Sequence, residues 1–188
     1  MRKAWIFLAI ILFLVVVGIA WYVSGLNRVV RMDEEVNEAW AQIDTQLKRR
    51  SELIPDLVAT VKGYAKHERE VFTRIADARS ALAGARTVAE KLEAARELDG
   101  ALARLLAIVE RYPDLKANQT FIRLMDELAG TTNRIAVARV RYNRAVKAFN
   151  AHIREVFGRF FARRRGLAEP RTYFEVEKEE AEIPPVEF

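Results

Sequence analysis

A stretch of 23 residues without a single charge lies near the start of the sequence. It constrains the fold more than any other feature. It occupies residues 4–26 and reads AWIFLAIILFLVVVGIAWYVSGL. A helix needs roughly 20 consecutive apolar residues to cross the hydrocarbon core of a bilayer, so this length suits a membrane span. Trp5 near one end, and Trp21 and Tyr22 near the other, suit interfacial aromatic belts. We expect residues 1–27 to form a membrane anchor.

A cleaved signal peptide is the alternative for this stretch, because Gly-Ile-Ala at 18–20 could serve as a small-residue cleavage site. The apolar run continues past that site, which favours an uncleaved single span. Its orientation is nearly balanced, since Arg2 and Lys3 precede the span and Arg28 and Arg31 follow it. The flanking charges slightly favour an N-terminus on the cytoplasmic side of the membrane, with the rest of the chain outside.

After the span, apolar residues recur at alternating spacings of four and three, the rhythm of helices buried along one seam. This pattern predicts long helices at about 28–83, 88–111 and 119–165. Thr87 and Glu90 form an expected capping box at the start of the second helix. We therefore predict an all-α protein, in which residues 28–165 form an up-and-down bundle of three long helices. The number rises to four if the first helix breaks near Pro55.

Composition narrows the classes of function. The chain has no cysteine, and its two histidines, His67 and His152, lie in no metal-ligand spacing. No nucleophile motif or glycine-rich phosphate loop occurs, so we expect no enzyme, no cofactor and no metal. The basic run at 163–165 lacks the aromatic or glycine-rich motifs of nucleic-acid binders. A solvated helix end or a contact with anionic lipid fits that run better than nucleic acid does.

Several polar residues interrupt the apolar seam. One interpretation is that their long side chains reach out of an incompletely closed seam. The other is buried ion pairing that fixes helix register. If the first two helices pair about a turn near residue 85, Arg50 lies roughly level with residue 120, beside Asp114. The polar positions considered are Arg50, Glu68, Asp99, Asp114, Thr132 and Arg139.

The second helix is about half as long as the first, so a simple hairpin leaves two stretches of seam uncovered. Monomers avoid large exposed apolar patches, so either a further helix of the same chain or a second copy must cover them. We expect a homo-oligomer held together by these seams. The residues concerned are Val36, Trp40, Ile43, Leu47, Tyr142, Phe149 and Ile153.

Residues 166–188 form an acidic, proline-containing tail that we do not expect to be helical. TYFEVE at 172–177 alternates weakly and could form a short strand if something paired with it. The last residues, PPVEF, place Val186 and Phe188 on one side of an extended segment. Such a segment can dock on a sheet edge, as C-terminal peptides do on PDZ domains, or on another copy. The simpler interpretation is that the apolar residues at the end of the tail make only non-specific contacts.

At several blocks the sequence resembles the LemA family of bacterial proteins. The blocks are residues 33–68 (DEEVNEAW through GYAKHE), YPDLKAN at 112–118, RYN at 141–143, FN at 149–150, and YFE and PPVEF in the tail. The chain departs from the family at Leu26, where a tyrosine is usual, at Asn133, where an acid is usual, and at 156–158, where VFG replaces Phe-Pro.

The resemblance implies a single N-terminal span, a helical bundle and no established activity. Members are usually drawn with the N-terminus outside and the bundle in the cytoplasm, opposite to the orientation that the flanking charges favour. The leading hypothesis is a membrane-anchored scaffold that self-associates. The alternatives are an adaptor that presents clients or its own tail to a membrane protease, chaperone or PDZ-type partner, and an enzyme of unknown chemistry.

Overall fold

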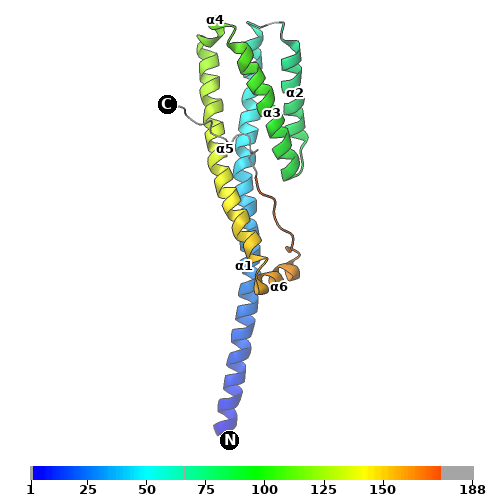
Figure 1. Ribbon diagram of the computed structural model, residues 1–188. Helices are drawn as coiled ribbons and strands as arrows, with labels where there is room; N and C mark the ends of the chain where they lie inside the picture. The colour runs from blue at the N-terminus through cyan, green and yellow to red at the C-terminus, as the bar shows by residue number, and fades with distance from the viewer. Residues whose placement is uncertain (1, 66, 175–188) are drawn as a thin grey trace, which may run out of the picture. The chain divides into compact units, whose positions relative to one another are not determined.

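The computed structural model describes residues 2–65 and 67–174, and every regular element among them is a helix. This confirms the all-α class (Figure 1). The helices are α1 (Arg2–Lys62), α2 (Arg69–Gly84), α3 (Val88–Val109), α4 (Pro113–Lys116), α5 (Gln119–His152) and α6 (Val156–Arg165). The expected docking residues of the tail, Val186 and Phe188, lie outside the described residues.

Contacts group the chain into two compact units. The anchor unit contains residues 2–40 and 141–174, and the bundle unit contains residues 41–65 and 67–140 of the described chain. Both α1 and α5 contribute one portion to each unit.

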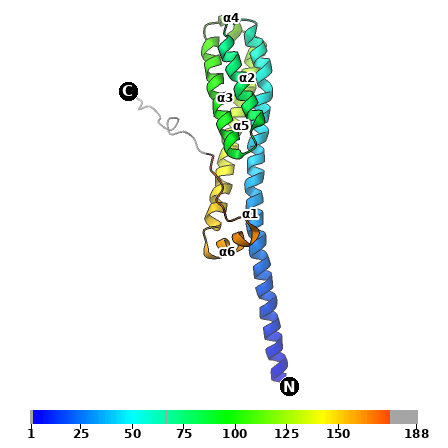
Figure 2. The same ribbon diagram turned by 90° about the vertical axis from the view of Figure 1, so that its right-hand side faces the viewer.

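In the bundle unit, α1, α2, α3 and α5 run alternately up and down beside one another (Figures 1 and 2). Each helix turns a row of apolar residues inward, at the spacing that the sequence predicts. The large side chains of the bundle unit that are least exposed are Ile43, Ile54, Leu57, Val61, Ile75, Leu98, Leu105, Leu115 and Thr131. The bundle therefore has four long helical segments, which is the alternative that the sequence left open.

The break that produces the fourth helix is not where it was expected. α1 continues through Pro55 as far as Lys62, and the chain leaves the helix between Gly63 and Glu68. Proline removes one helical hydrogen bond, but its neighbours Ile54 and Leu57 are buried and hold the helix on both sides. Glycine is also a poor helix former, and α1 ends at Lys62, directly before Gly63.

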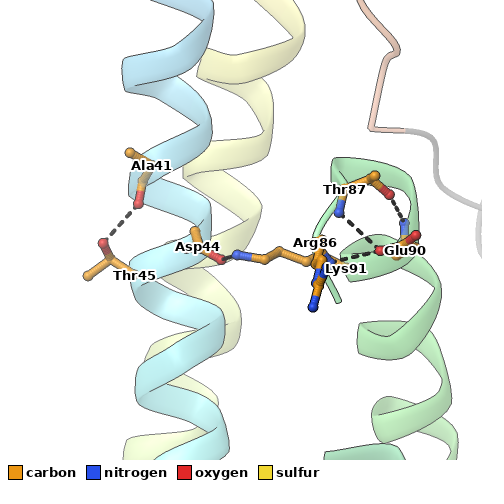
Figure 3. Close-up of polar contacts among 7 residues, drawn as sticks. All are labelled: Ala41, Asp44, Thr45, Arg86, Thr87, Glu90 and Lys91. Atoms are coloured by element: carbon orange, nitrogen blue, oxygen red, sulfur yellow. Dashed lines mark hydrogen bonds and ion pairs between the residues drawn. The ribbon is translucent and has the colours of Figure 1, made fainter. Parts of the chain in front are cut away.

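The capping box that the sequence predicts is present at the start of α3 (Figure 3). The amide of Glu90 donates to Thr87 Oγ1 at 3.1 Å, and Thr87 N–H donates back to Glu90 Oε2 at 3.1 Å. The Arg86 N–H donates to the same carboxylate at 2.8 Å. These backbone bonds, first that from Arg86, lower the pKa of the Glu90 carboxyl below its ordinary value. The carboxylate thus stays ionised and satisfies amides that the helix start leaves free.

Two loops of the bundle unit meet at one end of the bundle, where two blocks of the family resemblance come together. Arg111 Nη2 lies 2.7 Å from Glu68 Oε1, and the Asn118 side-chain amide donates to the Tyr64 hydroxyl at 3.2 Å. Asn118 also accepts from the amides of Thr120 and Phe121 and so caps α5. Tyr64, Glu68 and Asn118 of the two blocks therefore join the loops at this end of the bundle.

In the anchor unit, the C-terminal part of α5 packs along α1. Trp40 and Tyr142 stack with ring centroids 5.6 Å apart. The single helix that was expected to reach the arginine run is broken here, because α5 ends at His152 and α6 begins at Val156. Gly158 permits this sharp turn, since a Cβ on it would lie 1.9 Å from the His152 carbonyl oxygen. The departure from the family pattern at VFG therefore falls where only glycine fits the backbone.

Candidate functional site

The N-terminal part of α1 is long and apolar enough to cross a membrane, judged by length and composition, and none of its most apolar window is buried. Its large side chains are exposed, including Trp5 at 72% and Phe13 at 66%. In water this surface would be strongly unfavourable, whereas a bilayer would cover it. The site considered below lies at the end of this surface.

α6 docks on α1 through aromatic rings. Trp21 meets the rings of Phe157 and Phe161 edge-on, with centroids 5.4 and 5.1 Å apart. Tyr22 meets Phe160 and Phe161 at 6.4 and 5.9 Å. Trp21 and Tyr22 were expected at the membrane interface, and no sequence pattern indicated that they also hold a second helix.

A glycine on α1 makes this docking possible. A Cβ on Gly25 would lie 2.2 Å from a ring carbon of Phe161, which no side chain could tolerate without movement. The Phe161 ring therefore rests directly on the backbone of α1, and it is only 3% exposed. α6 is fixed at the level of residues 21–25, where the apolar stretch ends.

Gly166 reverses the chain after α6. It adopts a left-handed conformation, with φ at 71°, which glycine reaches without steric cost. The amide of Leu167 then donates to the Ala162 carbonyl at 2.9 Å, which satisfies a carbonyl at the helix end. The chain continues as a non-helical strap, residues 167–174, that lies along the α1 and α5 portions of the anchor unit.

Two asparagines of α5 hold the strap as a neighbouring β-strand would. Asn150 accepts from the Arg171 N–H and donates to the Arg171 carbonyl, both at 2.8 Å. Asn143, two helical turns earlier, does the same for Phe174 at 2.8 and 2.9 Å. Each carboxamide therefore pairs with both backbone groups of one residue. The short strand considered for 172–177 is thus not observed within the described residues, although the strap backbone is paired.

The strap also forms an ion pair with α1. The Arg171 guanidinium donates twice to Asp33 Oδ1, at 3.0 and 2.5 Å, and the Asp33 side chain is only 9% exposed. The Tyr142 hydroxyl donates to the Thr172 carbonyl at 2.8 Å. Burial raises the pKa of the Tyr142 phenol, partly opposed by the Arg171 charge, so the phenol stays protonated and keeps donating.

The predicted partner of Arg50 is wrong. Arg50 Nη1 lies 2.5 Å from Asp99 Oδ1, whereas Asp114 is exposed in the first turn of α4. The error follows from the extra break in the first helix, which reverses the chain once more and makes α1 and α3 parallel. The Asp44–Lys91 pair confirms this geometry, because its separation of 47 residues nearly matches that of Arg50 and Asp99.

The other polar positions of the seam are less buried than predicted. Asp99 is about half exposed, and the side chain of Glu68 is 26% exposed where it meets Arg111. Thr132 is exposed and donates to the Leu128 carbonyl one turn back, while Arg139 is partly exposed.

The residues expected to be uncovered are covered within the chain. Six of the seven are at most 4% exposed, and Trp40 is partly exposed against Tyr142. The six are Val36, Ile43, Leu47, Tyr142, Phe149 and Ile153. The fourth helix covers the seam in the bundle unit, and α5 with the strap covers it in the anchor unit. The interpretation that these seven residues need a second copy is therefore wrong.

No arrangement for metal binding occurs among the described residues, where no three or more His, Asp or Glu side chains gather. A surface recess of about 360 Å³ in the bundle unit is lined by Asp44, Ser51, Glu52, Arg79 and Lys91 among others. Asp44 is paired with Lys91, as Figure 3 shows. The other acid that lines the recess, Glu52, is exposed.

Comparison with known proteins agrees with the blocks described above. The profile of the LemA family matches residues 39–188. The chain belongs to the LemA family. It is 27% identical to Protein LemA of Metamycoplasma hominis, over 78% of this chain and 68% of that protein.

Two further relatives carry the name of an organelle. The chain is 27% identical to Magnetosome protein MamQ 2 of Paramagnetospirillum magneticum, over 74% of this chain and 61% of that protein. It is also 27% identical to Magnetosome protein MamQ of Magnetospirillum gryphiswaldense, over 78% and 63%. The chain thus spans less than two thirds of these magnetosome relatives. The names of these three relatives state no enzymatic activity. Family and apolar helix together are consistent with a membrane-associated protein without an established molecular activity.

The residues that matter most in the anchor unit were missed as site residues. Asp33 does follow the seam spacing, since it stands four residues after Val29 and three before Val36. Asn143 and Asn150 lie seven residues apart and so share one face of α5. Their spacing was available from the sequence, whereas their partners on the strap were not.

Proposed function

We propose that this LemA family protein is a non-enzymatic scaffold, anchored by one span in a bacterial cytoplasmic membrane, that presents the segment after its strap to a partner protein. One observation carries the proposal. The strap is held by paired backbone bonds at Arg171 and Phe174, which fixes where residues 175–188 begin. A chain that needed no defined exit would have no use for two asparagine clamps and a buried ion pair.

The presented segment has a composition suited to recognition. Residues 175–188 carry six Glu against one Lys and include Pro184 and Pro185. Acidic, proline-containing segments fold poorly alone and bind partners with little intrinsic structure of their own. A membrane protease, a chaperone or a PDZ-type domain would fit such a ligand. The magnetosome relatives support a role in organising a membrane compartment rather than in catalysis.

Self-association was the leading hypothesis from the sequence, and its main argument is lost. The residues that would have formed the contact are buried within one chain. The strap favours the adaptor alternative instead, because it gives the tail a fixed starting point. We therefore propose presentation of the tail without requiring a homo-oligomer.

Photo-crosslinking in bacterial membranes tests the proposal. A crosslinking residue replaces Ala181 in the tail or, as a control, the exposed Ala103 in the bundle unit. We expect position 181 to capture a discrete partner that position 103 does not. The Asn143→Ala/Asn150→Ala variant, which frees the strap, should weaken that capture at least fivefold. Equal partner profiles at positions 181 and 103, or unchanged capture after strap release, would refute the proposal.

The same cells can report the side of the membrane. Because the chain has no cysteine, a single cysteine at the exposed Val137 is a unique target for a membrane-impermeant maleimide. Labelling of intact spheroplasts places the bundle outside, and labelling only after lysis places it in the cytoplasm.

A further inference from the structure

We propose that α6 is an interfacial helix that binds anionic phospholipid headgroups in the leaflet where α1 leaves the bilayer. The inference rests on the proposed membrane span and assigns a ligand to a second element beside it. Three features of α6 support this assignment: the level at which it is fixed on α1, its exposed apolar side chains and its arginines, which have no carboxylate partner among the described residues.

The level of α6 follows from its contacts on α1. Phe157 and Phe161 pack on Trp21, and Phe161 rests on Gly25. The charge-free stretch ends one residue after Gly25, and Arg28 follows. Tryptophan and tyrosine concentrate at this boundary between hydrocarbon and water. α6 is therefore held at headgroup depth if α1 spans the membrane.

The outer face of α6 is apolar at its centre. Gly158, Phe161 and Ala162 are buried against the anchor unit. On the opposite face, Val156 is 83% exposed and Phe160 is 44% exposed, one turn apart. Phe157, beside them, is 63% exposed. Three large apolar side chains on a ten-residue helix thus stay 44–83% exposed despite their contacts on α1, and lipid at this depth would cover them.

Arginines flank this apolar face. α6 contains Arg159, Arg163, Arg164 and Arg165 and no acidic residue, and none of the four pairs with a carboxylate among the described residues. The Arg164 guanidinium lies over the Phe160 ring, 5.5 Å from its centroid.

Three of these arginines meet in one place. Arg159, Arg163 and Arg164 line a surface recess of about 360 Å³ together with Val156 and Phe160. Guanidinium groups match phosphate oxygens in pairs, so this recess suits a phosphate above an acyl chain.

Charge complementarity selects the occupant. A second copy would bring the same four arginines against these four, and like charges at an interface oppose association. An anionic lipid supplies both the phosphate for the arginines and the hydrocarbon for Val156 and Phe157. Each basic residue near an anionic bilayer strengthens the attraction about fivefold, since about 1 kcal/mol corresponds to that factor.

The test uses the full chain reconstituted in bilayers, with a fluorophore on a single cysteine at Val156. Quenching is compared when either phosphatidylglycerol or phosphatidylcholine carries brominated acyl chains in an equimolar mixture. We expect the phosphatidylglycerol to associate at least fivefold more strongly with this position. Arg159→Gln/Arg163→Gln/Arg164→Gln should reduce the ratio to about one. A matched control, Arg134→Gln/Arg141→Gln/Arg144→Gln on exposed positions of α5, removes the same charge and should leave the ratio unchanged.

Three outcomes overturn the inference. These are no quenching at position 156, equal quenching by both lipids, and loss of the preference in the control variant. A fluorophore at Val15 tests the membrane span separately from the lipid contact of α6, since quenching at position 15 reports the span alone. Quenching at 15 but not at 156 refutes the role of α6 and leaves the anchor intact. Absence of quenching at both refutes the anchor. If excess inorganic phosphate abolishes the lipid preference, the site binds free phosphate and the lipid assignment is wrong.

Discussion

Replacing Asn150 by alanine should free the strap locally while leaving the helices intact. Asn150 is 4% exposed, and its carboxamide makes two hydrogen bonds of 2.8 Å to the backbone of Arg171. A hydrogen bond contributes about 1 kcal/mol net, so losing two costs about 2 kcal/mol. Because 1.4 kcal/mol is a factor of ten, the opening equilibrium of the strap should rise about 30-fold.

Hydrogen exchange measures this opening directly. The Arg171 amide has Asn150 as its acceptor, so it exchanges only when the clamp opens. Mass spectrometry of a peptide covering 167–174, in nanodiscs, should show faster exchange in Asn150→Ala and unchanged exchange in α3. In Asn143→Ala/Asn150→Ala four bonds are lost, and the strap should exchange about a thousandfold faster, given about 4 kcal/mol.

The matched control is Asn133→Ala, since Asn133 is an exposed asparagine on the same helix. It should leave exchange in the strap at the parent rate. Unchanged protection of residues 167–174 in Asn150→Ala, with helix content preserved, would show that the clamp does not hold the strap. The reasoning from paired backbone bonds would then be refuted.

Three further predictions concern other contacts. Gly25→Ala should displace the Phe161 ring and destabilise the anchor unit by about 1–3 kcal/mol, measured by thermal melting in detergent beside Gly100→Ala, whose Cβ meets open space. Arg50→Met should change stability in urea by less than about 1 kcal/mol, because Arg50 Nε is buried without a partner among the described residues and its ion pair is half exposed. Because burial raises the pKa of Tyr142, the stability that its protonated phenol contributes is fully present below the unfolded pKa of about 10 and is lost as pH rises through the folded value. Alkaline titration of Tyr142→Phe should lack this loss.

Most of the fold could be predicted because helical periodicity is a local signal. The seam residues Ile43, Leu47, Ile54 and Leu57 are buried as their spacing predicts. The capping box at Thr87 was equally local and is confirmed. Breaks were harder, since proline is the stronger helix breaker by intrinsic propensity. Burial of the residues around Pro55 outweighed that propensity, and the chain turned at Gly63 instead.

Pairings across the chain could not be predicted, since they depend on where the chain reverses. One additional turn in the first helix changed the direction of α1 relative to α3 and moved the partner of Arg50 from Asp114 to Asp99. The same turn supplied the helix that covers Ile43 and Leu47. A single misplaced break therefore produced both the wrong ion pair and the unnecessary second copy.

Two short blocks of the family resemblance are explained by the strap. RYN contributes Tyr142 and Asn143, FN contributes Asn150, and the strap contributes Arg171 and Phe174. The strap residues follow these two blocks by more than 20 positions, yet the side chains of both blocks meet along this one segment. The requirement they share is the docking of a backbone, since each asparagine pairs with an N–H and a carbonyl whatever side chain the strap residue bears. This pairing therefore depends on the position of the strap backbone and does not depend on the side chains of the strap residues. A chain with these two blocks therefore holds the strap backbone at residues 171 and 174.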